Sequence, residues 1–150
     1  MFRGRYEHNV DEKGRTSFPA KFREVLAGDE RLVVTTKTKL GDTCLIAYPF
    51  PAWADFEKRL DEKPTFDRGA VLLRRHFVGA AEECLVDKQG RVLLPARLRK
   101  DAGIEDSLVW IGQGRTLEIW ASHKWQEQEK AAESPESIED LRKKLEDMGL

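Results

Sequence analysis

A duplicated motif constrains the fold of this chain more than any other feature of its sequence. Asp-x-x-Gly-Arg occurs twice, as DEKGR at Asp11–Arg15 and as DKQGR at Asp87–Arg91. In each copy, three residues separate the arginine from a Pro-Ala pair. The same residue types at the same spacing indicate that the chain holds two copies of one structural unit.

The similarity between the two halves continues beyond the motif. With an offset of 76 residues, DEKGRTSFPAKFR lies over DKQGRVLLPARLR, and Leu32–Val34 lies over Leu108–Trp110. Past the following loop the offset falls to 72, where Leu45–Pro49 lies over Leu117–Ala121. A unit of roughly 45 residues buries too little apolar surface to be stable alone. We therefore expect the two halves to complete one core together.

Each unit has a pattern typical of two strands, a helix and two further strands. The glycine of the motif supplies the positive φ of a tight turn, and the aspartate can accept hydrogen bonds from backbone amides of that turn. The proline then ends the second strand and suits the first turn of a short helix. The sequence thus predicts an α+β fold of duplicated β-β-α-β-β units. The residues expected to stabilise the turns are Asp11, Gly14, Asp87 and Gly90.

Outside the repeated units the chain shows helical patterns. We place the first unit at residues 5–51 and the second at 81–124, with a helical linker at 52–80 and a helical tail at 125–150. In the tail, a Ser-Pro pair at residues 134–135 suits the start of a helix. The apolar residues of the tail form a narrow stripe that suits packing on a neighbour. The stripe consists of Ile138, Leu141, Leu145 and Met148.

Composition and hydropathy favour a globular protein of the cytoplasm. The chain is 40% hydrophobic and 35% charged. No apolar run approaches the roughly 20 residues that a membrane helix needs, and the first residues lack the apolar segment of a signal peptide. Cys44 and Cys84 are far apart in the sequence, and we expect them to be isolated buried thiols.

Charge is distributed unevenly, although the net charge is only −1. Lys and Arg outnumber Asp and Glu in residues 1–27 and in residues 68–100, which contain the two motifs. Acidic residues dominate from Glu133 onward. Positive charge therefore concentrates around the motifs, and negative charge lies in the tail.

Sequence patterns of catalysis and metal binding are missing. The chain has no Gly-rich phosphate loop, no Gly-x-Ser-x-Gly and no His-Glu-x-x-His. Its histidines have no partner at ligand spacing, so we expect no catalytic residue, no cofactor and no metal. The tryptophans fall on apolar faces and are expected in the core rather than as platforms for base stacking. They are Trp53, Trp110, Trp120 and Trp125.

Taken together, the repeated segments resemble the MraZ family, a relative of the AbrB/SpoVT swapped-hairpin transcription factors. The resemblance covers residues 1–130. It is carried by MFRGRYEHNVDEKGRTSFPAKFR, CLIAYPFPAW, CLVDKQGRVLLPARLRKDAGI and LEIWASHKW. It implies a swapped-hairpin, AbrB-like β-barrel core that both halves of one chain build, and it implies ring-shaped homo-oligomers.

The same resemblance implies a function in transcription. It implies a sequence-specific regulator that binds short direct repeats in double-stranded DNA, upstream of the division and cell-wall gene cluster that contains its own gene. The implied partners are therefore DNA and further copies of the chain, with no membrane. The implied location is the cytoplasm, in association with the nucleoid.

The motif arginines are the first candidates for contact with DNA. Arg15 and Arg91 can make bidentate contacts to guanine or to phosphate oxygens. The tip residues Lys13, Lys88 and Gln89 can reach the backbone or a base edge, and Arg3 and Arg5 could extend a phosphate-binding face. The DNA-binding residues expected are Lys13, Arg15, Lys88, Gln89, Arg91, Arg3 and Arg5.

Other roles stay open for these and neighbouring residues. The motif Asp–Arg pairs could simply lock their turns, and locking and DNA contact can coexist. For Lys21, Arg23, Arg97 and Arg99 a solvated helix face is favoured over phosphate contact. Two functions from other classes compete with DNA binding. One is an interaction module resembling AbrB-fold antitoxins, whose acidic tail binds a partner, and the other is a structural ring without a DNA role.

Overall fold

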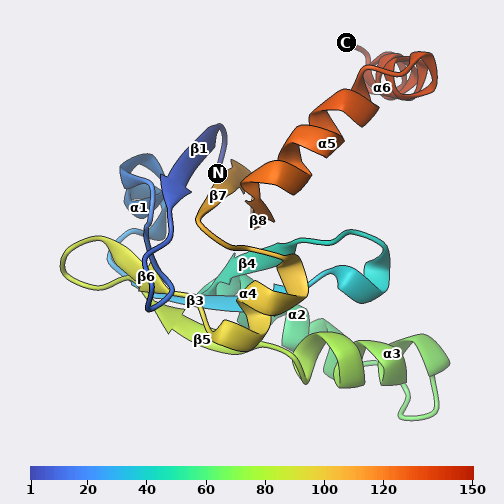
Figure 1. Cartoon of the computed structure of the whole chain (residues 1–150). Coiled ribbons are helices and arrows are strands. Elements are labelled where there is room, and N and C mark those ends of the chain that lie inside the picture. The colour runs from blue at the N-terminus through green and yellow to red at the C-terminus, as the bar shows by residue number, and fades with distance from the viewer.

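The computed structural model describes all 150 residues and contains two units with the same order of elements (Figure 1). The first unit consists of β1 (Arg5–Asn9), β2 (Arg15–Ser17), α1 (Ala20–Leu26), β3 (Arg31–Thr36) and β4 (Leu45–Pro49). The second consists of β5 (Glu82–Leu85), β6 (Arg91–Leu93), α4 (Ala96–Ala102), β7 (Ser107–Gly112) and β8 (Leu117–Ala121). The predicted β-β-α-β-β order and the α+β class are confirmed.

The two units exchange strands with each other. The larger sheet has the order β1-β7-β8-β4-β3-β5, and β2 and β6 form a separate two-stranded ribbon. The first strand of each unit pairs with the third strand of the other unit, as β1 with β7 and β5 with β3. The fourth strands, β4 and β8, pair at the centre of the sheet. All of these pairings are antiparallel. Because the first two strands of each unit pair with strands of the other unit, the swapped-hairpin arrangement is present within one chain.

The β2–β6 ribbon links the two edges of the larger sheet. Single bridges join Val10 to Thr16 and Val86 to Val92, which connect the ends of the edge strands to the ribbon. The bridging residues also bond across the units, because Val10 N donates to Asp106 O at 2.8 Å and Val86 N donates to Glu30 O at 2.9 Å. The ribbon therefore covers the gap between β1 and β5.

One core lies between the sheet and the elements that cover it. Its cluster of 20 buried residues draws on both units, and Phe18 of the first unit meets Trp110 of the second with ring centroids 5.1 Å apart. The expectation of a joint core is confirmed. Trp53 and Trp120 are also buried, whereas Trp125 is only partly buried. Cys44 and Cys84 are buried free thiols, as expected.

The linker helices form a smaller apolar cluster on the sheet. They are α2 (Phe50–Asp61) and α3 (Arg68–Leu73), and the latter continues as a π-helical turn, Arg74–Val78. Trp53 of α2 and Phe77 of the π-helical turn pack with Val33 of β3. This cluster packs the linker against the face of β3 and β4 that points away from the main core.

The tail consists of two helices that extend away from the rest of the chain (Figure 1). They are α5 (Ser122–Ala132) and α6 (Pro135–Asp147). As predicted, Ser134 caps α6, and its side chain accepts a hydrogen bond from Ser137 N. The apolar stripe of α6 is exposed along its whole length. None of the helices in the chain is long and apolar enough to cross a membrane.

Candidate functional site

The first motif forms a tight turn that its aspartate closes. Gly14, at φ +90°, donates from its amide to Asp11 O at 3.0 Å. The Asp11 Oδ1 atom accepts hydrogen bonds from the amides of Lys13 and Arg15, both at 2.9 Å. Its Oδ2 atom lies 2.9 Å from Arg15 Nε. One carboxylate thus holds both the backbone of the turn and the side chain of the motif arginine.

The second motif forms the same turn with a looser arginine. Asp87 Oδ1 accepts from the amides of Gln89 at 2.8 Å and Arg91 at 3.0 Å, and Gly90 has φ +76°. Arg91 Nε, however, lies 3.7 Å from Asp87 Oδ2. Arg91 Nη2 donates instead to Gln89 Oε1 at the tip of the turn. The second arginine is therefore held by a tip side chain as well as by its aspartate.

Both aspartates are held in the charged form. Hydrogen bonds from the backbone amide and the side chain of Arg15, and from the amide of Lys13, lower the pKa of Asp11 below its usual value. The backbone amide of Arg91 has the largest part in lowering the pKa of Asp87, and the positive charge of Arg15 also contributes. The last contribution crosses from one unit to the other, so the two motifs are close enough to act on each other electrostatically.

The β2–β6 ribbon places the two motif arginines on one face. Thr16 and Val92 are buried and point inward, so their neighbours on each strand point outward. Arg15 lies opposite Leu93, and Arg91 lies opposite Ser17. Arg15 and Arg91 are therefore diagonal neighbours, at a spacing of about 7–8 Å. Leu93, which is 54% exposed, and Ser17 occupy the other two positions of this face.

The structure brings five of the predicted contact residues together and leaves two apart. Lys13, Lys88 and Gln89 are exposed on the turns that extend from the ribbon, next to the two arginines. Arg5 lies at the start of β1, and the turn follows the end of that strand, roughly 17 Å away for five extended residues. Arg3 lies beyond it, beside the bridge between Phe2 and Gly114.

Arg5 has partners in the tail. Its Nη1 atom lies 3.1 Å from Glu129 Oε2, and its guanidinium lies 5.4 Å from the centre of the Trp125 ring. Both partners belong to α5. Arg5 therefore helps to hold α5 against the sheet.

The expectation of a solvated helix face is wrong for two of the four helix cations. Arg23 and Arg99 are half-buried, and each donates a hydrogen bond to a backbone carbonyl near the turns. Lys21 is exposed, and Arg97 is exposed but contacts Glu82 and Ala80 O. Their equivalence at an offset of 76 was visible in the sequence, but their contacts with the motif turns were not, because each turn belongs to the opposite unit and only the strand exchange brings it near.

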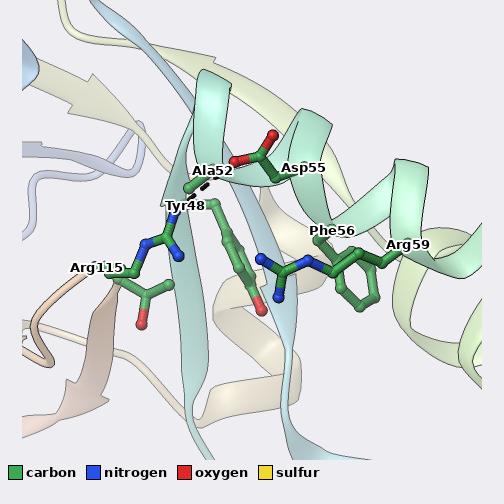
Figure 2. A pocket seen from close by; sticks show the side chains of 7 residues that line it. Tyr48, Ala52, Asp55, Phe56, Arg59 and Arg115 are labelled. Carbon is green, nitrogen blue, oxygen red and sulfur yellow. Dashed lines mark ion pairs between the residues drawn. The ribbon is translucent and has the colours of Figure 1, made fainter.

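A separate hollow lies between α2 and the β7–β8 turn (Figure 2). The side chains of Arg115 and Arg59 reach toward Tyr48 from opposite sides, and Arg115 Nη2 lies 3.7 Å from Asp55 Oδ2. Burial raises the pKa of Tyr48. The hollow holds no residue of either motif. Nowhere in the chain do three or more His, Cys, Asp or Glu side chains gather as a metal site would require.

Comparison with known proteins gives one consistent result. The family model described as MraZ protein, antitoxin-like, matches residues 1–76 and again residues 77–147. A protein named transcriptional regulator MraZ from Marinomonas sp. (strain MWYL1) is 43% identical over 143 residues, which is 94% of this chain and 93% of the relative. A protein of the same name from Caldanaerobacter subterraneus subsp. tengcongensis is 39% identical over 150 residues, with both chains covered completely.

Proposed function

This chain belongs to the MraZ family, and from that premise we propose that it is a transcriptional regulator that binds double-stranded DNA through the β2–β6 ribbon. One observation carries the proposal: the ribbon holds Arg15 and Arg91 on a single outward face, flanked by exposed lysines at the tips of the two turns. The proposed role is binding, without catalysis, cofactor or metal.

A two-stranded ribbon with two arginines on one face suits the major groove. That groove admits a two-stranded β-ribbon, and arginine is the residue that most often contacts guanine there. Arg15 and Arg91 would contact base edges, and Gln89 would contact an adjacent base or hold Arg91 in place. Lys13 and Lys88 at the turn tips would contact phosphates on either side. Exposed Leu93, opposite Arg15 on the same face, could meet a thymine methyl group.

The turn-locking role supports this contact rather than competing with it. Asp11 occupies Nε of Arg15 and leaves both Nη atoms without a partner in the chain. An arginine whose stem and Nε are fixed loses less side-chain entropy on binding. The turn residues would therefore fix the orientation of the two motif arginines toward DNA. These residues are Asp11, Gly14, Asp87 and Gly90.

We further propose that a ring-shaped oligomer binds direct repeats upstream of the gene cluster that contains its own gene. A single chain of net charge −1 offers few phosphate contacts, so its affinity would be low and sensitive to salt. Several ribbons on tandem repeats would gain avidity through effective concentration, by roughly 10²–10⁴-fold. Arg3 and Arg5, distant from the turns, would contact only flanking phosphates. Such a protein would be associated with the nucleoid in the cytoplasm.

One observation favours a second candidate function. The α6 stripe is exposed, and the matching family model is described as antitoxin-like. An exposed apolar stripe on a projecting helix suits a partner protein. In this alternative the tail would bind a second protein, and the ribbon would have no role in the interaction.

The DNA-binding proposal is tested by fluorescence anisotropy with a labelled fragment from upstream of this gene and a scrambled fragment. We compare the wild type with Arg15→Ala/Arg91→Ala, across a salt series. The control is Lys143→Ala/Lys144→Ala, which removes the same charge from α6. We expect the wild type and the control to prefer the upstream fragment, and the folded arginine variant to lose that preference. Equal binding by the arginine variant would overturn the proposal.

A further inference from the structure

Two arginines outside the motifs contact the motif turns. Arg23 lies near the end of α1 and Arg99 occupies the equivalent position on α4. The motif turns that they contact belong to the opposite units. The role of each arginine therefore follows from its contacts with these turns.

Arg99 of the second unit covers the turn of the first. Its Nε atom donates to Leu94 O at 2.9 Å. Its guanidinium lies directly over Gly14: a Cβ atom built on Gly14 would lie 2.6 Å from Nε and 2.7 Å from Cζ of Arg99. Gly14 is buried as a result, although its turn extends from the ribbon. Leu94 N in turn donates to Gly14 O at 3.0 Å, so the Leu94 peptide binds both the arginine and the turn.

Arg23 of the first unit contacts the turn of the second in a related way. Its Nη2 atom donates to Asp87 O at 3.2 Å, and its Nη1 atom lies 3.3 Å from the Cβ position of Gly90. Its Nε atom lies 3.4 Å from Glu30 Oε2. The carbonyl of Glu30 accepts from Val86 N at 2.9 Å, immediately before the second motif. Arg23 and Glu30 therefore fasten the second turn to the first unit.

We propose that Arg23 and Arg99 are positioning residues, each of which holds the DNA-contacting turn of the opposite unit. The contact with DNA rests on the function proposed above, whereas the holding of each turn by the arginine of the opposite unit, here called bracing, does not. Each turn then has its rigid form only when both units are folded. A guanidinium that covers a glycine and bonds to backbone carbonyls reduces the freedom that the turn would lose on binding. The duplication within one chain thereby couples the geometry of the two reading turns.

Hydrogen exchange with mass spectrometry tests the bracing in the absence of DNA. Peptides that span residues 11–15 and 87–91 report on the two turns. Arg99→Ala should speed exchange in the first turn by about fivefold and leave the second unchanged, because Gly14 loses its cover and the Leu94 peptide, which binds Gly14 O, loses its hydrogen bond from Arg99 Nε. Arg23→Ala should do the reverse. The controls are Lys100→Ala and Lys21→Ala, exposed cations on the same helices, and they should change neither turn.

Two outcomes of the exchange experiment would overturn the proposal. One is an effect confined to the turn of the same unit, and the other is an effect no larger than that of the lysine controls. If an alanine variant does not fold, Arg99→Lys and Arg23→Lys replace it. Lysine keeps the charge but has neither the Nε donor nor the planar group, so the bracing still predicts faster exchange across the units.

DNA titration separates bracing from direct phosphate contact. Loss of a brace should weaken binding several-fold with an unchanged dependence of affinity on salt. Loss of a phosphate contact should lower the slope of log K against log salt by about 0.9. A lowered slope with unchanged exchange would assign Arg23 and Arg99 to DNA contact and reject the bracing. If the wild type bound no DNA, the proposed function would fail, and the exchange experiment would still decide the bracing.

Discussion

Thr16 and Val92 occupy equivalent positions in the two units and lie opposite each other at the centre of the β2–β6 ribbon. The hydrogen bonds on either side are equivalent as well: Phe18 N donates to Gly90 O at 2.8 Å and Leu94 N donates to Gly14 O at 3.0 Å. An approximate twofold axis therefore passes between the two residues. Their side chains break this symmetry, because Thr16 carries a hydroxyl and Val92 does not.

The hydroxyl of Thr16 predicts that the ribbon can be stabilised. Thr16 is only 2% exposed, and its Oγ1 atom has no hydrogen-bond partner. A buried hydroxyl without a partner costs about 1–3 kcal/mol. Thr16→Val, which keeps the shape, should raise the free energy of unfolding by about 1 kcal/mol in urea titration. The reciprocal variant Val92→Thr should lower it, and a stabilising Val92→Thr would contradict this explanation.

The motif aspartates predict a loss of stability in acid. The pKa of each is lowered from 3.8 in the folded chain, chiefly by the backbone amides of Arg15 and Arg91. The stability that the two carboxylates contribute is complete above their pKa in the unfolded chain. It is lost as the pH falls through their lower pKa values in the folded chain. Asp11→Asn/Asp87→Asn should therefore be less stable than the wild type at neutral pH. When urea unfolding midpoints are measured at decreasing pH, the difference in stability between variant and wild type should shrink below about pH 4. A difference in stability that does not depend on pH would contradict this role of the aspartates.

Local structure could be predicted from the sequence because local residues determine it. The motif glycines have the positive φ that the turn pattern predicts, and Ser134 caps the tail helix as its position before Pro135 indicates. Both features depend on neighbours within a few residues. The offset between the halves was sufficient to predict a shared core, since neither half alone carries enough apolar surface.

The composition of the site could be predicted only in part. The motif pattern picked out Arg15 and Arg91, but nothing local shows that they share a face, because this depends on the register of β2 against β6. Arg3 and Arg5 were grouped with them by charge, and the direction of β1 places them at its other end. Arg23 and Arg99 were taken as solvated because the turn residues that they contact, Asp87 and Gly14, lie more than 60 residues away in the other unit.

Burial predicts that both cysteines are unreactive in the folded chain. It raises the pKa of Cys44 and of Cys84 to about 12, so only ~10⁻⁴ of either thiol is ionised at pH 8. A thiol-specific disulfide reagent should label neither cysteine until the chain unfolds, and both should then react. The labelling rate should follow the urea unfolding curve. Rapid labelling of one thiol in the native chain would show that its surroundings open without global unfolding.

Two glycines with the same backbone conformation separate turn strain from the arginine brace. Gly14 and Gly28 both have φ +90°. A Cβ atom at Gly28 would meet nothing within 4 Å, whereas one at Gly14 would collide with the guanidinium of Arg99. Each alanine substitution should cost about 1–2 kcal/mol of stability, because a residue with a Cβ is strained at positive φ.

Only Gly14→Ala should also weaken binding to the upstream DNA fragment. The added methyl group displaces Arg99, whose flexible side chain can move at little further cost in stability, and the first turn then loses its brace. Unfolding in urea gives the stability of each variant, and anisotropy gives its affinity for DNA. We expect similar losses of stability and a several-fold loss of affinity for Gly14→Ala alone. If Gly28→Ala weakened DNA binding as much, the effect would come from general strain, and the contact between Arg99 and Gly14 would have no part in it.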